Sequence, residues 1–229
     1  MKIRFLFIAS ILFNFSFLLH AASFDPAVDS KVFSCVARTP LQARILTSTD
    51  SLGEEKKGMV ASFLKAYEAF NAEDLFGSEA AQERGGGEFA KQSVLEEAFQ
   101  EEIDALGTPG ILHVRLETQI GELVGYFSLE DWDIYSKRPE NFPSHSIYVR
   151  QFYVLPSFQG QGVGKVAMST LLQQLVPSAQ HIYIATRRVN EPAKALYESL
   201  GFKERSDSLH GLSPHKYISY ERHLGSSLN

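Results

Sequence analysis

The sequence predicts a single α/β domain in which helices cover a mixed β-sheet. Residues 111–117 and 123–129 are β-type runs separated by a short turn, which indicates a hairpin. Strand and helix patterns then alternate from 147 to 200, and two amphipathic helical patterns precede the hairpin. A hairpin followed by alternating strands and helices is typical of a sheet that contains both antiparallel and parallel neighbours.

The composition is that of an ordinary globular protein. The chain has 229 residues, of which 44% are hydrophobic and 21% are charged, and this suits one domain with a buried core. A net charge of −5 and a pI of about 5.8 provide no basic field for a phosphate backbone, so nucleic-acid binding is not expected and a cationic substrate is mildly favoured. Cys35 is the only cysteine, which excludes an internal disulfide.

Residues 1–22 have the pattern of a signal peptide. Lys2 and Arg4 precede an apolar run from Phe5 to Leu19, and the small residues Ala21-Ala22 follow it. The run is shorter than the roughly 20 residues that a membrane-spanning helix needs, so no permanent span is expected. The sequence therefore predicts export with cleavage near residue 22, with a cytoplasmic location as the alternative.

The segment 23–42 is expected to be a linker that could include a short strand, and the folded domain is expected at 43–229. A strand at 44–47 leads to a helix, which Ser51 and Glu54 open with the spacing of a capping box. Its apolar stripe is expected in the core and consists of Val60, Phe63, Leu64, Tyr67 and Phe70.

The polar segment 71–92 contains Gly85-Gly86-Gly87 and is predicted to be a flexible loop. Ser93 and Glu96 repeat the capping-box spacing and predict a second amphipathic helix that ends before Gly107. Its apolar residues are Leu95, Phe99, Ile103 and Leu106.

Proline and changes of period mark the remaining elements. After the hairpin, the loop 131–146 is expected to be irregular and a possible border of a substrate site. The expected elements beyond it are a strand at 147–155, a helix at 163–175, a strand at 181–186, a helix at 192–200, and a closing hairpin of 202–205 with 216–222.

The segment Gln159–Lys165 contains three glycines, follows a strand and opens an amphipathic helix. The N–H groups at a helix start have no partner within the helix and lie at the positive end of its dipole, so they can bind a pyrophosphate. A P-loop is excluded because Gln159 and Val166 stand where that motif requires Gly and Ser or Thr. A dinucleotide fingerprint is weak because Arg187-Arg188 stand where an acidic residue is needed.

The pattern that remains is Gln/Arg-x-x-Gly-x-Gly, matched by Gln159, Gly162 and Gly164, and in this the sequence resembles the GNAT N-acetyltransferase superfamily. A second segment, Asn190–Phe202, is similar to the closing motif of that family and reads Asn-x-x-Ala-x-x-Leu-Tyr-x-x-Leu-Gly-Phe. The family's order of elements also matches residues 43–224.

The resemblance implies the GNAT acyl-CoA N-acyltransferase fold, with a mostly antiparallel sheet and one parallel pair at the cofactor site. It implies acetyl-CoA as the cosubstrate and an amine as the acceptor, with pantetheine along the strand and pyrophosphate on the glycine loop. The residues expected to bind the coenzyme are Phe152, Tyr153, Val154, Gln159, Gly160, Gln161, Gly162, Val163, Gly164, Lys165 and Asn190.

The resemblance also assigns Tyr197 as the acid that protonates the departing thiolate, although a purely packing role is the alternative. Asn190 and Gly201 have structural explanations as well, as an N-cap and a left-handed C-cap.

The general base has no clear candidate in the sequence. Many relatives carry a glutamate on the strand before the glycine loop, where this chain reads Val149-Arg150-Gln151-Phe152. Glu130, Asp131 and Asp133 are named as substitutes, and Arg150 is a candidate to bind a substrate carboxylate or to balance a buried charge. The histidines lack metal-ligand spacing, so no metal is expected.

Three functions remain open from the sequence. The first is transfer of an acetyl group from acetyl-CoA to a primary amine of a small molecule or protein. The alternatives are a catalytically weak acyl-CoA-binding module and an exported effector or interaction protein that reuses the fold. The sequence does not indicate an acceptor or an oligomeric state.

Overall fold

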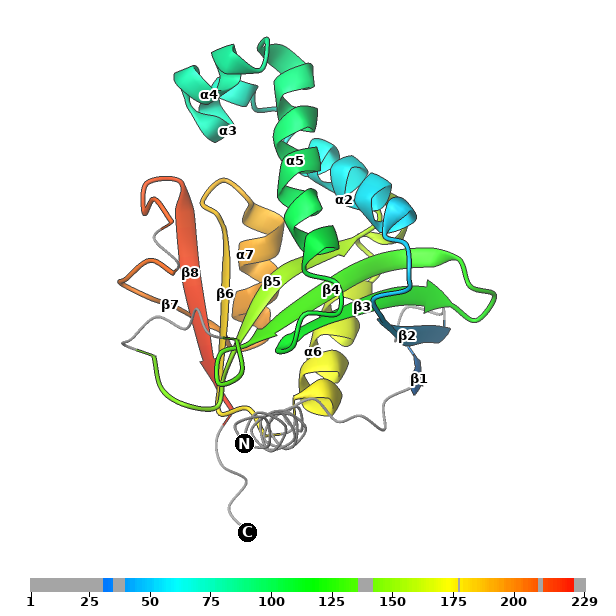
Figure 1. The fold of residues 1–229 in the computed structure, drawn as a ribbon. Coiled ribbons are helices and arrows are strands. Elements are labelled where there is room, and N and C mark those ends of the chain that lie inside the picture. Colours follow the sequence, from blue (N-terminus) through cyan, green and yellow to red (C-terminus); the bar gives the residue numbers. More distant parts are fainter. Residues whose placement is uncertain (1–30, 35–39, 136–141, 177, 210–211, 225–229) are drawn as a thin grey trace, which may run out of the picture.

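The described part of the chain forms one twisted β-sheet with helices packed on both of its faces (Figure 1). The computed structural model describes residues 31–34, 40–135, 142–176, 178–209 and 212–224. In these residues the sheet has eight strands in the order β1-β2-β3-β4-β5-β6-β8-β7. The strands are β1 (Lys31–Ser34), β2 (Pro40–Leu46), β3 (Ile111–Thr118), β4 (Leu123–Asp131), β5 (Ser146–Val154), β6 (His181–Arg187), β7 (Lys203–Glu204) and β8 (Tyr217–His223).

Strands β5 and β6 run parallel, and the other neighbouring strands of the sheet pair antiparallel. The predicted mixed, mostly antiparallel sheet is therefore confirmed. The connection from β5 to β6 runs through a helix, as a parallel crossover requires. The predicted closing hairpin also forms, because β7 pairs with β8.

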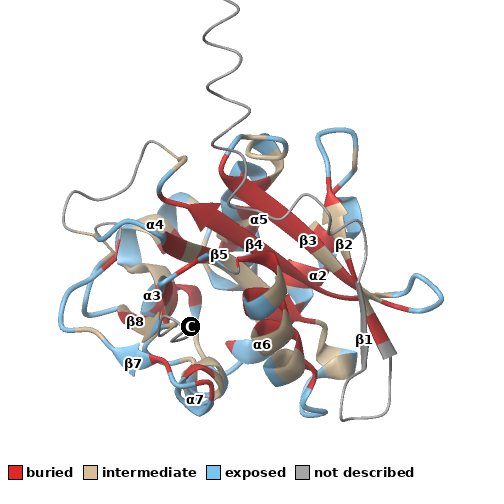
Figure 2. Ribbon diagram, turned by 90° about the horizontal axis from the view of Figure 1, so that it is seen from below, coloured by how far each residue is buried: buried red, intermediate tan, exposed pale blue. Residues whose placement is uncertain are grey.

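The helices are divided between the two faces of the sheet (Figures 1 and 2). Helices α2 and α5 pack on the face that carries Tyr126 and Tyr153, and α6 and α7 pack on the face that carries Phe127. Both layers bury the central strands, which are red in Figure 2. The helices of the described residues are α2 (Gly53–Ala66), α3 (Ala72–Phe76), α4 (Ser78–Glu83), α5 (Gly87–Asp104), α6 (Val163–Leu175) and α7 (Glu191–Ser199), and a 3₁₀ turn, η2, spans Pro156–Phe158.

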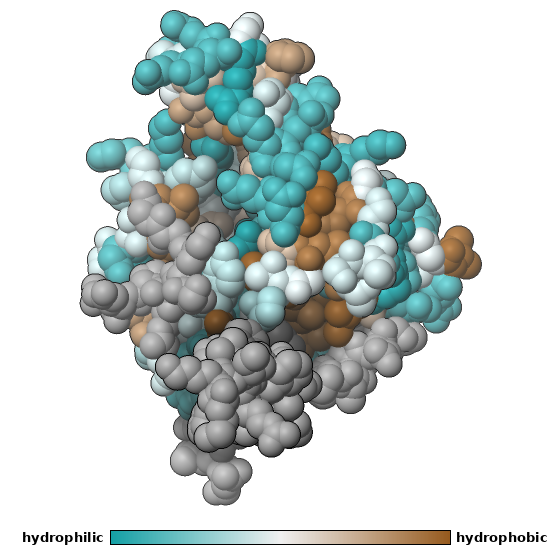
Figure 3. Space-filling view, viewed as in Figure 1, coloured by the Kyte–Doolittle hydropathy of each residue, from teal (hydrophilic) through white to brown (hydrophobic). Residues whose placement is uncertain are grey.

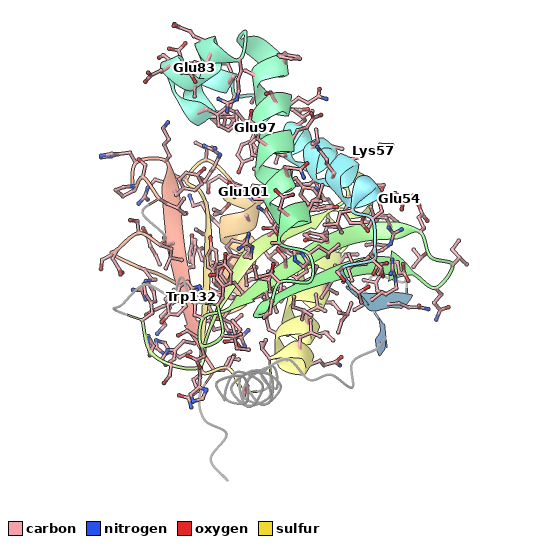
Figure 4. The ribbon with its side chains drawn as sticks, viewed as in Figure 1. Glu54, Lys57, Glu83, Glu97, Glu101 and Trp132 are labelled. Atoms are coloured by element: carbon pink, nitrogen blue, oxygen red, sulfur yellow. The ribbon has the colours of Figure 1, made fainter. Side chains whose placement is uncertain are left out.

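Helix α2 lies directly on β5. Gly58 makes this approach possible, because a Cβ at that position would come within 2.8 Å of Leu155 Cδ2 and 3.0 Å of the Tyr153 hydroxyl. The charged residues of α2 and α5 that Figure 4 labels, Glu54, Lys57, Glu97 and Glu101, are exposed. Figure 3 accordingly shows a largely hydrophilic surface over α3, α4 and the outer side of α5.

The segment 71–92 differs from the predicted flexible loop. It contains α3, α4 and the start of α5, and Asn71 opens α3 with a capping box that the sequence reading missed. The Asn71 side chain accepts from the Asp74 N–H at 2.8 Å, and the Asp74 carboxylate accepts from the Asn71 N–H at 3.4 Å. The glycines of this segment, Gly77 and Gly85–Gly87, all have positive φ, a conformation that favours glycine.

Both predicted capping boxes are wrong. Helix α2 begins after Leu52 without a side-chain cap, and the Ser51 hydroxyl instead accepts from the Gly53 N–H at 3.4 Å. Ser93 lies inside α5, which begins six residues earlier at Gly87. The spacing alone misled because it recurs by chance in sequences rich in serine and glutamate.

The sheet begins earlier in the chain than residue 43. Strand β1 and the first residues of β2 fall within the segment expected to be a linker, and they pair with each other at one edge of the sheet. The predicted signal peptide and Cys35 lie outside the described residues. Among the residues described, no helix has the length and apolarity needed to span a membrane.

The loop 131–146 lies at the end of β5 opposite the glycine loop. Its Trp132 packs inward and stacks on Tyr148 and Tyr183 at ring-centroid distances of 5.7 and 5.2 Å. Phe142 meets Trp132 edge-on at 4.7 Å. These contacts close the aromatic cluster at this end of the sheet, and none of the described loop residues lines the groove presented below.

Candidate functional site

A groove of about 800 Å³ lies where β5 and β6 separate. This volume is within the range of small-molecule and cofactor sites. One half of the groove is formed by the end of β5, the glycine loop and α6, and we call it the loop half. The other half is formed by α2, α3, α5 and the end of β6, and we call it the cap half. Figure 1 shows α3 and α4 above the ends of β6 and β8.

The opening follows from the strand pairing. Strands β5 and β6 are paired only as far as Val149 and Ile184. Beyond this point β5 follows β4 while β6 follows β8. A β-bulge lies at the point of separation, because Gln151 and Val149 pair with the adjacent residues Ser128 and Leu129 and leave Arg150 between them.

The opened edge of β5 presents unpaired peptide groups to the groove. Leu155 donates its N–H to the Val124 carbonyl at 2.8 Å, so the alternation of an antiparallel ladder turns the peptide groups of Tyr153 toward β4 and those of Phe152 and Val154 toward the groove. The Val154 carbonyl is already occupied, since it accepts from Ser62 Oγ at 3.1 Å and from Gln159 Nε2 at 2.8 Å. The Val154 N–H and both peptide groups of Phe152 therefore face the space where pantetheine was expected.

Tyr153 differs from the other two expected pantetheine residues. Its side chain packs beneath α2, where its hydroxyl donates to the Glu55 carbonyl, and its peptide groups belong to the β4–β5 ladder. Gln159 also has a role that the motif did not specify, because its amide ties the glycine loop to the end of β5.

The glycine loop ends in an uncapped helix. Gly162, with φ of +78°, is the N-cap of α6 and has no side chain to bond the first turn. The N–H groups of Val163, Gly164 and Lys165 consequently have no acceptor among the described residues. Gly164 lies beside the Phe152 ring and Leu196, where a Cβ would make ordinary contacts of 3.5 to 3.9 Å. The loop half thus combines a helix N-terminus with a backbone that a ligand can approach.

Two lysines line the groove on the side of the glycine loop. Lys165 is exposed in the first turn of α6, and Lys65 at the end of α2 donates to the Pro156 carbonyl at 3.4 Å. Positive charge beside an open helix N-terminus favours a phosphate-bearing ligand.

The closing motif adopts the expected local structure. The Asn190 side chain accepts from the Ala193 N–H at 3.3 Å and caps α7, and Gly201 has φ of +81° after the helix. Asn190 Nδ2 also donates to Thr186 Oγ1 at 3.3 Å, which holds the start of α7 against β6. The capping role of Asn190 is thereby observed, and Asn190 lines the groove as well.

Tyr197 lies at the junction of the two halves of the groove. It is 5% exposed and packs against Phe202 and Tyr220, with ring-centroid distances of 6.0 and 5.8 Å. No hydrogen-bond partner for its hydroxyl is found among the described residues. Burial raises the pKa of Tyr197, and the neighbouring tyrosines 67, 148 and 220 add to the rise. The hydroxyl therefore stays protonated at neutral pH and can donate a proton.

Arg150, the bulged residue, is held between two buried glutamates. Its Nε donates to Glu102 Oε1 and its Nη1 donates to Glu130 Oε2, both at 2.8 Å. Glu102 comes from α5 and Glu130 from β4, and each is 2% exposed. Burial opposes the charge of Arg150, but the two carboxylates outweigh it and raise the pKa of Arg150. Of the two roles considered for Arg150, the balance of buried charge is the one observed.

The network continues beneath α5. Glu102 Oε2 accepts from Ser128 Oγ at 2.7 Å and from the Tyr126 hydroxyl at 3.3 Å. His113 contacts the Tyr126 hydroxyl through Nδ1 at 2.5 Å and the Ala105 carbonyl through Nε2 at 3.3 Å. Burial lowers the pKa of His113, although Glu102 acts in the opposite direction. Sequence reading missed Glu102 and His113, because nothing local shows that they meet.

The three acidic residues considered as bases do not line the groove. Glu130 is occupied by Arg150 and by Trp132 Nε1, which donates to it at 2.8 Å. Asp131 accepts from the Asp133 N–H, and Asp133 accepts from the His145 N–H at 2.7 Å, at the far end of β5. Among the described residues that line the groove there is no Asp, Glu or His.

The cap half is aromatic and basic. Phe63, Tyr67 and Phe76 line it, with ring centroids 4.2 Å apart for the first pair and 6.2 Å apart for Phe63 and Phe76. Arg187, at the end of β6, lies over the Phe76 and Tyr217 rings at 4.8 and 4.9 Å and donates to the Leu75 carbonyl. The sequence reading used Arg187 only to reject a dinucleotide motif, and the missed signal is a cation at the end of a strand that borders the site.

Within the described residues no group of three His, Cys, Asp or Glu side chains is placed to hold a metal ion.

Comparison with known proteins agrees with this geometry. The model of the Acetyltransferase (GNAT) family matches residues 78–202, which is more than half of the chain. No curated protein sequence matches significantly. The match includes β3 to α7, the glycine loop and Tyr197.

Solved structures of acetyltransferases resemble the chain at low sequence identity. One is a Salmonella typhimurium acetyltransferase that modifies the N-terminal serine of the 50S ribosomal protein L7/L12, with 18% identity and a TM-score of 0.51 over 85% of this chain and 99% of that chain. Another is the PaiA N-acetyltransferase from Thermoplasma acidophilum in complex with coenzyme A, with 15% identity and a TM-score of 0.49 over 80% of this chain and 98% of that chain. Because the family model covers more than half of the chain, including β3 to β6 and both motifs, the chain belongs to the GNAT acetyltransferase family.

Proposed function

We propose that the protein is an N-acetyltransferase that transfers an acetyl group from acetyl-CoA to a primary amine of a small molecule or protein. The observation that carries this proposal is the groove itself, in which β5 and β6 separate directly above an uncapped helix start. The named relatives include a complex with coenzyme A, which supports the choice of donor.

The residues of the loop half suit the parts of acetyl-CoA. The N–H groups of Val163, Gly164 and Lys165 would receive the pyrophosphate, with the positive-φ glycines 160 and 162 keeping the backbone accessible. The free peptide groups of Phe152 and Val154 would bond the pantetheine amides in the manner of an added strand. Of these groups, an N–H near the thioester would stabilise the oxygen of the tetrahedral intermediate.

Tyr197 is the proposed acid. When the intermediate collapses, the carbon–sulfur bond breaks and the sulfur of coenzyme A carries the electron pair away. The Tyr197 hydroxyl donates its proton to that sulfur, which leaves as the thiol of coenzyme A. Tyr197 belongs to α7 and lines the groove, and this supports its proposed role.

The acceptor must arrive with a neutral amine. An amine with a pKa of about 10 is protonated at neutral pH, and the described groove offers no carboxylate or imidazole to take the proton. We infer that the proton leaves to solvent before or during attack. This route favours acceptors whose amine pKa is unusually low, such as α-amino groups with a pKa near 8.

Calorimetry with acetyl-CoA tests donor binding, and a screen of amines for release of the coenzyme thiol tests transfer. Binding together with thiol release for at least one amine is expected. Binding of acetyl-CoA without release for any class of amine would identify the protein as a binding module, and absence of binding would remove the proposal.

Export is a separate proposal and rests on the sequence of residues 1–22. We propose that the leader is cleaved near residue 22 and that the domain of residues 43–229 functions outside the cytoplasm. Intact-mass analysis of protein from the native host should give a chain without the leader. A full-length cytoplasmic product would contradict this proposal and leave the catalytic proposal unaffected.

A further inference from the structure

The charged side chains that line the groove differ in whether they already have a partner. Four basic side chains line it, and no Asp or Glu does so among the residues described. Lys165 lies in the first turn of the helix whose start is assigned to the pyrophosphate, and Lys65 donates to the Pro156 carbonyl just after β5. Arg150 is already paired with Glu102 and Glu130. These three cations are therefore accounted for, and Arg187 is the one that remains.

Arg187 has no carboxylate partner in the described structure. Its guanidinium is held between the Phe76 and Tyr217 rings and makes one hydrogen bond, from Nη1 to the Leu75 carbonyl. A guanidinium has five N–H donors in a fixed planar arrangement, so most of its donors have no acceptor in the described chain. The two rings fix its plane, which lowers the entropic cost of binding a planar anion.

Polar groups surround the same place. Tyr67, Thr186, Asn190 and Arg187 all line the groove. Burial raises the pKa of the Tyr67 hydroxyl, while the charge of Arg187 and the side chains of Asn190 and Thr186 each act more weakly to lower it. Tyr67 is also one of the tyrosines that raise the pKa of Tyr197. Arg187, Tyr67 and the proposed acid therefore line the same groove.

We propose that Arg187 binds a carboxylate of the acceptor, so that the acceptor is an amine with a carboxylate a few bonds away, as in a free amino acid. The proposal rests on the proposed acetyl transfer and names its substrate class. It also agrees with the lack of a base in the described groove. The α-amino group of a peptide or amino acid amide has a pKa near 8, and the negative charge of a free carboxylate raises the pKa of the neighbouring amine. Pairing that carboxylate with Arg187 reduces the rise, so the amine loses its proton more readily. The net negative charge of the chain had favoured a cationic acceptor, but the local charge of the groove is the opposite.

Arg187 also has a structural task that any test must separate from binding. It holds the end of α3 through the Leu75 carbonyl, and Lys216 does the same through the Phe76 carbonyl at 2.8 Å. Lys216 does not line the groove. A Lys216→Met variant therefore loses a comparable contact to α3 and leaves the proposed anion site intact, which makes it the matched control.

The experiment compares the twenty amino acids with their carboxamides as acceptors in wild type, Arg187→Met, Arg187→Lys and Lys216→Met. Wild type should use at least one free acid with a KM roughly 10- to 100-fold below that of its amide, which is the usual worth of a hydrogen-bonded charge. Arg187→Met should remove this preference by raising the KM of the acid, with little change for the amide. Lys216→Met should keep the preference for the free acid over its amide, and Arg187→Lys should keep part of that preference.

Several results would overturn the proposal. These are equal use of acids and amides by wild type, an equal effect of Arg187→Met on both, or binding of acetyl-CoA with no amino acid accepted. If Arg187→Met does not fold, the wild-type ratio and Arg187→Lys still decide the outcome. Failure of the proposed function is recognised separately, because wild type would then show no heat of binding with acetyl-CoA or would release no coenzyme thiol with amines of any class, including amines that carry no carboxylate.

Discussion

The two halves of the groove are built in different ways. The loop half comes from one continuous stretch of chain, in which the end of β5, the turn η2 and the start of α6 follow one another within about 20 residues. The cap half brings together α2, α3, α5 and the end of β6, which are distant in sequence. Arg187 and Leu75, which are in contact there, are 112 residues apart. A local motif therefore predicts the donor side, whereas the acceptor side depends on tertiary packing.

The largest expected effect concerns Tyr197, where the halves meet. Tyr197→Phe removes the hydroxyl and keeps the ring, so kcat should fall about 10²- to 10⁴-fold while acetyl-CoA affinity stays nearly constant. Steady-state kinetics with an acceptor found by screening, together with calorimetry, checks both values. A Phe variant with full kcat would show that Tyr197 only packs.

Next in size is the loss of the cation in the buried network. Arg150→Met leaves Glu102 and Glu130 buried without a counter-charge, and the free energy of unfolding should fall by about 3–5 kcal/mol. Arg44→Met is the control, because Arg44 is 41% exposed in its ion pair with Asp50 and should cost less than about 1 kcal/mol. Denaturant titration measures both variants. Equal costs would mean that the network does not stabilise the cap half.

A smaller effect is expected on the donor side. Gly162→Leu places a side chain at the open helix start and should weaken acetyl-CoA binding by roughly 10-fold or more. Gly121→Leu is the matched control, since Gly121 has a similar φ of +82° with nothing within 4 Å but lies in the β3–β4 turn. Both variants carry similar backbone strain, so calorimetry isolates the effect of the position. Equal acetyl-CoA affinities would argue against the loop as the phosphate site.

The smallest expected effect is a difference between the two halves in how their stability depends on pH. Burial lowers the pKa of His113, so the unfolded chain binds a proton near pH 6.5 that the folded chain resists. Stability from this group is present above pH 6.5 and is lost as the pH falls, by at most about 1.4 kcal/mol per pH unit. Hydrogen exchange at pH 5.5 should therefore increase in α5 before α6. In His113→Gln this pH dependence should disappear, and uniform exchange in wild type would contradict it.

The elements that could be predicted from the sequence are those whose ends are marked by local patterns. The hairpin, β5, α6, β6 and α7 were placed within about one to two residues, because proline and a change of period mark their ends. The predicted loop at 71–92 was wrong because its polar composition hid the capping of α3 by Asn71. Glu102, His113 and the partners of Arg187 could not be found, since each belongs to a contact between elements that are distant in sequence.

The bulge at Arg150 has a consequence for how the strand can vary. Tyr148 and Tyr153 are five residues apart, so in a regular strand their side chains would point to opposite faces. The extra residue restores the same face for both, as their pairing with Glu130 and Tyr126 shows. Removing one residue here would reverse the facing of everything beyond it and turn the Phe152 ring away from α6 toward α2. Two constraints therefore fix the number of residues in β5 at this point. Arg150 is needed for the ion pairs with Glu102 and Glu130, and the extra residue is needed so that the side chains after it point to their present faces of the sheet.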